Sequence, residues 1–218
     1  MDTAIIAIVF HLAILIFSVV IHEVSHGLAA HALGDPTAKD AGRLTLNPLR
    51  HLDPVGSVLV PLASSLLGGI IIGWAKPVPY NPMNLRLSNQ DVGSAIVGAS
   101  GPLANIAVAL VFGSLVRISG AWAPGLGVAA GPLTEMMSAI VFINLLLAVF
   151  NFVPIPPLDG SKVLFSLLPA RWFGVRMFLE QFGFVLLLLF IFYFSGLIRP
   201  IVSFLFQVIV GSGLSAYR

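Results

Sequence analysis

Long apolar segments with almost no charge dominate the sequence, and they limit the surroundings in which the chain can fold. The first covers residues 4–33, and others cover 92–116, 132–152, 175–195 and 200–213. Charged residues make up 9% of the chain, against about 25% in an ordinary soluble domain. So few charges cannot cover a soluble surface, and about 20 apolar residues cross a bilayer as a helix. The sequence therefore predicts an all-α polytopic membrane protein with about five transmembrane helices.

The stretch between the first two of these helices does not fit a simple span. Residues 55–73 are apolar but rich in Gly and Ser, and 74–90 carries closely spaced prolines and asparagines that interrupt a helix. We expect a re-entrant or extended segment near 55–80. Within it, Ile70–Tyr80 is either an extended edge that offers pairing to an unwound peptide or an inert loop, and both interpretations remain open.

Composition also excludes several classes of function. The net charge is +2 with no basic run, so we expect no nucleic-acid partner, and the absence of cysteine rules out disulfides and thiolate metal sites. The first apolar segment lacks a basic start and is longer than the apolar part of a signal peptide, which favours a retained helix. We expect one domain over 1–218, with a core at 4–165 and C-terminal helices at 175–213.

The first apolar segment contains the pattern HExxH as His22-Glu23-Val24-Ser25-His26. On a helix the two histidines are about 40° apart and one turn apart, so both imidazoles can reach one metal ion. Glu23 lies beside them and can accept a proton from a water on that metal. The alternative is a helix end at the membrane interface with two snorkelling histidines. Ionisable groups inside apolar helices are costly and usually functional, which favours the metal site.

A catalytic zinc site usually has three protein ligands, so a third is needed. Asp159 is the best acidic candidate, because it follows the span 132–152 directly in a proline-broken segment, whereas most other acids lie in polar connections. Irregular backbone at membrane depth is tolerated where it is buried in protein or lines a wet cavity. The alternative is an ordinary Asp-Gly turn after a helix.

Three segments together resemble the site-2 protease family of intramembrane zinc metalloproteases. They are HEVSH, SGPLAN and NFVPIPPLDG, and the stretches GDPTAKDAGRLTLNPLRHLDPVGS and GWAKPVPYNP resemble the minimal prokaryotic members. The match runs from about residue 20 to 165. The resemblance implies that Asp159 is the third zinc ligand and that Asn151 lies near the metal, to bind substrate or steady the oxyanion. It places Gly101, Pro102 and Asn105 in a central-helix motif that is structural or substrate-facing.

The expected activity is hydrolysis of peptide bonds within or near transmembrane segments of membrane-protein substrates, with one Zn²⁺ per chain and Glu23 as the base. We expect neither of the PDZ and CBS modules that many members of this family carry. A metal-ion transporter or channel is a rival, because intramembrane His and Asp also mark ion pathways, but such a site has no need of Glu23. An inactive scaffold is a second rival, which the complete set of predicted catalytic residues disfavours.

The metal residues also predict how the chain crosses the membrane. His22 lies at the end of its helix opposite the N-terminus, and Asp159 must reach the same depth, which requires 55–73 to enter and return rather than cross. Most basic residues then fall on the metal side: Lys39, Arg43, Arg50, Lys76, Arg86, Lys162, Arg171 and Arg176, against Arg117 and Arg199 opposite. By the positive-inside rule we expect a multi-pass protein of the cell membrane with its active site toward the cytoplasm.

Overall fold

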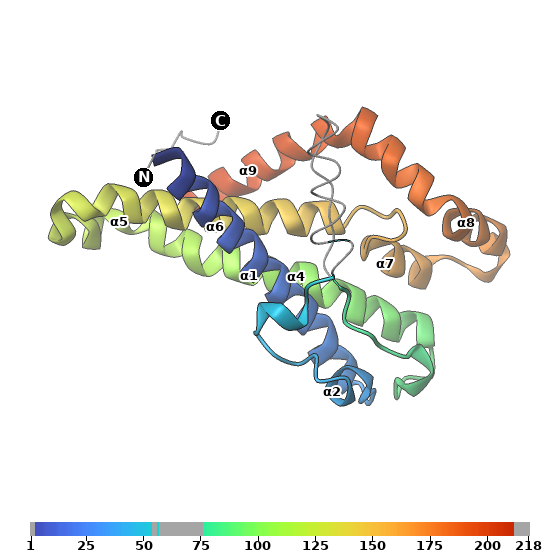
Figure 1. Cartoon of the computed structure of the whole chain (residues 1–218). Coiled ribbons are helices and arrows are strands. Elements are labelled where there is room, and N and C mark those ends of the chain that lie inside the picture. Colours follow the sequence, from blue (N-terminus) through green and yellow to red (C-terminus); the bar gives the residue numbers. More distant parts are fainter. Residues whose placement is uncertain (1–2, 54–55, 57–75, 212–218) are drawn as a thin grey trace.

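In the computed structural model, residues 3–53, 56 and 76–211 are described, and this part of the chain is helical without a strand (Figure 1). The α-helices are α1 (Thr3–Ala32), α2 (Thr37–Asp40), α4 (Gln90–Arg117), α5 (Ser119–Trp122), α6 (Ala130–Asn151), α7 (Gly160–Leu167), α8 (Phe173–Leu189) and α9 (Ile198–Val210). Shorter 3-10 turns are η1 (Pro48–Arg50), η3 (Pro82–Asn84), η4 (Ala123–Ala129), η5 (Ala170–Trp172) and η7 (Ser195–Leu197), and η6 (Phe190–Phe194) is a π-helix. The predicted re-entrant segment 55–73 lies outside the described residues, apart from residue 56.

Four helical runs in the described part are long and apolar enough to cross a membrane: Ile8–Ala32, Gln90–Arg117, Ser119–Asn151 and Ala170–Val210. Large apolar side chains on their outer faces are exposed, for example Ile8 at 61% and Val111 at 59%. Such surfaces are stable in lipid, where the helix satisfies every backbone hydrogen bond internally. The prediction of an all-α polytopic membrane protein is confirmed.

The two C-terminal segments, expected as separate helices, form one continuous candidate span among the described residues, Ala170–Val210. Arg176 in α8 binds both carboxylate oxygens of Asp91 at the start of α4, each at 3.0 Å. Arg117 at the end of α4 donates to the Val208 carbonyl of α9 at 2.8 Å. The run therefore begins beside one end of α4 and ends beside the other. Figure 1 shows α8 and α9 meeting at an angle, and the π-helix and 3-10 turn over 190–197 join them.

The core of the bundle is formed by α4, α6 and α9. α1 and α6 run in one direction and α4 runs in the other (Figure 1). Their facing side chains form a buried apolar cluster: Ala109, Val116, Val141, Leu145, Ile198, Val202, Phe206 and Val210.

The end of α1 lies beside the start of α4. Ala30 at the end of α1 packs with Leu85 and Val97, and the Leu33 carbonyl accepts the Arg86 amide at 2.7 Å. The connection between α1 and α4 therefore starts and finishes at the same end of the bundle.

Candidate metal centre

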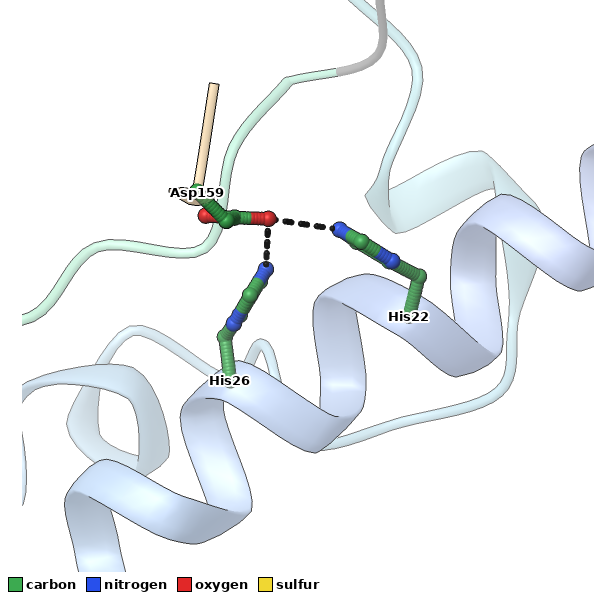
Figure 2. Close-up of side chains that lie close together, drawn as sticks. All are labelled: His22, His26 and Asp159. Carbon is green, nitrogen blue, oxygen red and sulfur yellow. Dashed lines mark hydrogen bonds and ion pairs between the residues drawn. The ribbon is translucent and has the colours of Figure 1, made fainter. Parts of the chain in front are cut away.

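One helix, α1, and one irregular segment bring His22, His26 and Asp159 together (Figure 2). Asp159 lies in the turns between α6 and α7, and its Oδ2 is 3.0 Å from Nε2 of His22 and 3.0 Å from Nε2 of His26. All three residues are buried, with 6%, 7% and 7% of their surface exposed. The three predicted ligand residues, far apart in the sequence, thus present their donor atoms to a single point.

Each imidazole is held by its other nitrogen, which fixes the atom that faces the site. Nδ1 of His22 donates to Oδ1 of Asn105 at 2.7 Å, and Nδ1 of His26 donates to the Val97 carbonyl at 2.6 Å. A neutral imidazole that donates from Nδ1 carries a lone pair on Nε2. Two lone pairs and a carboxylate oxygen therefore converge.

The donor set fits a divalent metal ion. Zinc prefers imidazole nitrogen and carboxylate oxygen, and tetrahedral bonds of about 2.0–2.1 Å separate its ligand atoms by about 3.3 Å. The Nε2 to Oδ2 distances of 3.0 Å are within a few tenths of an ångström of that spacing. A cation at this point would satisfy all three groups at once, whereas two unprotonated nitrogens facing a carboxylate satisfy none of them.

Asn105 belongs to a buried polar network across three helices. Its Nδ2 donates to Oδ1 of Asn144 in α6 at 2.8 Å and to the Ser18 carbonyl of α1 at 3.2 Å. Asn144 in turn donates to the Ser18 hydroxyl at 2.9 Å, and both asparagines are fully buried. The sequence offered Asn105 as a substrate or oxyanion candidate. In the structure its side chain is hydrogen-bonded to His22. Ser18 and Asn144 complete the network, and the sequence could have indicated both, because they are polar residues within apolar helices.

Two glycines of α4 allow this helix to pack closely against the metal-binding residues. A Cβ on Gly101 would lie 2.5 Å from Nε2 of His26 and 2.7 Å from Cε1 of His22. A Cβ on Gly98 would lie 3.2 Å from the Asp159 carbonyl. Both distances are shorter than ordinary van der Waals contact, so glycine lets α4 approach the imidazoles and the aspartate segment closely.

The segment that carries Asp159 is also closely packed. A Cβ on Gly160 would lie 2.2 Å from the Phe152 carbonyl oxygen, so the residue after the aspartate must be glycine for the chain to turn back on α6. Oδ1 of Asp159, the oxygen that does not face the histidines, binds Nζ of Lys162 at 3.0 Å. From the sequence, Lys162 was predicted only to lie on the metal side, and not to bind the aspartate.

The side chains of the other two predicted residues, Glu23 and Asn151, form hydrogen bonds with backbone groups. Glu23 is half-buried on α1 beside His22, and its Oε2 accepts the backbone N–H of Val78 at 2.8 Å. Asn151 is half-buried at the end of α6, and its Nδ2 donates to the Leu147 carbonyl of its own helix at 2.9 Å.

Comparisons with known proteins find one family model and several relatives that match this chain. Residues 113–191 match the model of peptidase family M50. The chain is 35% identical over 178 residues to the Bacillus subtilis protein named "Putative zinc metalloprotease YwhC", covering 80% of this chain and 76% of that protein. It is 32% identical to "Putative zinc metalloprotease Rip2" of Mycolicibacterium smegmatis, covering 68% of this chain and 53% of that protein.

A Mycobacterium tuberculosis protein of the same name is 28% identical, covering 76% of this chain and 63% of that protein. The matches to the mycobacterial relatives thus span less than two thirds of their length, and no solved structure gives a significant match. The Bacillus subtilis relative is matched over most of its length, and the family match covers the LDG segment with its aspartate. The chain belongs to peptidase family M50.

Proposed function

We propose that this chain is an intramembrane zinc metalloprotease that hydrolyses peptide bonds within or near transmembrane segments of membrane-protein substrates. One observation carries the proposal: His22, His26 and Asp159 form a buried group able to hold a metal ion, within helices that are long and apolar enough to cross a bilayer. Glu23 adjoins this group on the same helix. We regard residues 1–218 as one such domain.

In this proposal His22, His26 and Asp159 hold one zinc ion per chain. When bound, zinc supplies Lewis acidity, which makes a water molecule nucleophilic near neutral pH and polarises the scissile carbonyl. Glu23 accepts a proton from the water as the water oxygen adds to the carbonyl carbon. The C–N bond then breaks, and Glu23 returns the proton to the departing amine.

The two asparagines take different parts in the proposal. Asn105 is a positioning residue, because its hydrogen bond to Nδ1 keeps the lone pair of His22 directed at the metal position. Asn151 remains the candidate donor to the developing oxyanion. Its side chain would have to exchange the Leu147 carbonyl for the substrate oxygen.

The arrangement of helices supports a cytoplasmic active site. The connection between α1 and α4 starts and finishes at one end of the bundle, as the hydrogen bond between Leu33 and Arg86 shows. α6 returns to that end, so Asp159 arrives at the depth of the histidines. Eight basic residues are expected on that side, and the positive-inside rule then makes it cytoplasmic.

The test is cleavage of single-span membrane peptides by the purified protein, with and without a chelator. Wild type should cleave and lose activity when zinc is removed. Glu23→Gln should keep zinc and fold but lose cleavage, because an amide cannot accept the water's proton. A His22→Ala/His26→Ala double variant should lose both zinc and cleavage. Comparable cleavage by Glu23→Gln would exclude Glu23 as the base, and zinc transport across liposomes without cleavage would favour a transporter.

A further inference from the structure

We propose that residues 76–81, hereafter the strap, form a positioning element for Glu23, and that the Val78 backbone N–H is the group that holds its carboxylate. This inference rests on the proposed role of Glu23 as the base. The strap crosses α1 at the catalytic residue and has neither helical nor strand structure before the turn at Pro82.

The sequence of the strap isolates one hydrogen-bond donor. Pro77 and Pro79 have no backbone N–H, so Val78 provides the only one in three consecutive residues. That N–H is directed at Oε2 of Glu23, at 2.8 Å. Because proline fixes φ near −65°, the residues on both sides of Val78 also have restricted backbones. The donor is therefore single and held in a stiff segment.

The side chain of Val78 fixes how deeply the strap lies against α1. Val78 is 7% exposed. It packs over Gly27, one turn along α1 from Glu23, where an added Cβ would lie 2.9 Å from Cγ1 of Val78. The same glycine faces Leu44, 2.6 Å from that Cβ position. The Val78 side chain thus packs against α1 at Gly27, and this contact holds the Val78 N–H close to the Glu23 carboxylate.

Buried charged side chains fasten both ends of the strap. Arg43, which is 6% exposed, donates from Nη2 to the Lys76 carbonyl at 2.6 Å and to the Pro77 carbonyl at 3.2 Å. Asp35, which is fully buried, accepts the Asn81 amide on Oδ2 at 2.6 Å. Because the strap is held at both ends and packed against α1 in the middle, it can hold the Glu23 carboxylate in one position.

The bonds at Asp35 show how firmly that end is held. Burial alone would raise the pKa of Asp35. Hydrogen bonds from Thr37, Asn84 and Asn81 outweigh burial and hold the pKa below its usual value. The carboxylate is therefore charged at neutral pH, and its hydrogen bond from Asn81 of the strap is of the stronger, charge-assisted kind.

The same contacts argue against the strap as an edge for a substrate peptide. An added β-strand needs backbone donors as well as acceptors along the edge. Over 77–79 the only N–H is already bound to Glu23, and the Lys76 and Pro77 carbonyls are bound by Arg43. A hydrogen bond on Oε2 instead leaves Oε1 of Glu23 as the oxygen available to accept a proton.

Hydrogen exchange of the full chain in detergent tests the contact without relying on activity. Val78 has the only exchangeable backbone amide in 77–79, so this stretch gives a single-site signal. We expect the amide to exchange at least about tenfold more slowly in wild type than in Glu23→Ala, since opening must break the hydrogen bond first. Glu23→Gln keeps an acceptor oxygen and should keep most of the protection. His26→Ala removes a proposed ligand and should leave the amide protected.

Equal exchange in wild type and Glu23→Ala would overturn the proposal. If wild type shows the expected exchange but cleaves no peptide, the proposed protease function fails while the contact stands, so the two failures are distinguishable.

Kinetics test what the contact does. Val78→Pro removes the donor, and we expect kcat to fall by about 10- to 100-fold with KM and zinc content little changed, as for a misplaced base. Val78→Ala keeps the N–H and should lose much less activity than Val78→Pro. Met83→Ala, at a side chain 72% exposed beyond the strap, is the surface control. A rise in KM at unchanged kcat would show that the strap binds substrate and would refute the positioning role.

Discussion

Gly101 gives the sharpest test of the metal centre, because its replacement acts on the ligands without removing any of them. A Cβ at this position would lie 2.5 Å from Nε2 of His26 and 2.7 Å from Cε1 of His22. Ordinary contact between such atoms is about 3.5 Å. Gly101→Ala must therefore displace one or both imidazoles by most of an ångström.

The size of that displacement sets the expected effect. Metal–ligand distances in working sites stay within about 0.2 Å of their normal values, so a ligand moved several times farther is largely lost. Disturbing the groups that orient ligands already costs about 10- to 100-fold in metal affinity, and we expect Gly101→Ala to lose at least about 100-fold. Zinc affinity is measured by competition with a chromogenic chelator in detergent, alongside thermal unfolding.

A matched substitution on the same helix separates the metal effect from general overpacking. Gly113 also lies in α4, and a Cβ there would lie 2.2 Å from Cγ2 of Ile209 in α9, far along the helix from the histidines. Gly113→Ala should lower thermal stability but keep zinc. If Gly101→Ala binds zinc as tightly as wild type, the metal does not lie between these imidazoles.

The remaining predictions concern the surroundings of the site and its orientation. Asn105→Leu removes the acceptor for Nδ1 of His22 and should lower zinc affinity by about 10- to 100-fold. Unchanged zinc affinity in chelator competition would contradict the positioning role of Asn105. Lys162→Met frees Oδ1 of the aspartate and should weaken zinc more than the charge-keeping Lys162→Arg does, as the same assay measures. Asn151→Ala should slow cleavage by about 10² without zinc loss, and parallel losses would make it structural. Leu49→Cys and Val128→Cys, at exposed side chains, should be labelled from the cytoplasmic and the opposite side respectively; labelling from one side only would refute the topology.

The sequence could predict the part of the site that a single helix determines. His22, Glu23 and His26 lie within two turns, so helical geometry alone places both imidazoles on one face. Asp159 could be proposed because a carboxylate beside an apolar span needs a partner. The structure brings its Oδ2 to 3.0 Å from both imidazoles. Neither Gly101 nor the Val97 carbonyl could be assigned a contact, because each depends on where α4 crosses α1.

The two C-terminal segments show a different limit of prediction from sequence. Hydropathy measures the length of apolar segments, and the lengths of 175–195 and 200–213 suit two separate spans. It does not show whether a helix turns back at a break or only bends. Here the chain continues through π and 3-10 turns at 190–197, and α9 reaches Arg117 at the far end of α4. The bend is decided by packing of α9 against α4 and α6, which no local pattern records.

The prolines of the strap show how one residue type can carry two kinds of information. In the sequence, Pro77 and Pro79 indicate only that no helix can run through 74–90. In the structure their second property matters more, since they lack N–H groups and Val78 therefore has the one backbone N–H of residues 77–79, which binds Glu23. A proline on each side of a single buried residue therefore delivers one backbone hydrogen bond to a defined place. That inference needs the position of Glu23 on α1, and it becomes available only when the two segments, 55 residues apart in the chain, are seen together.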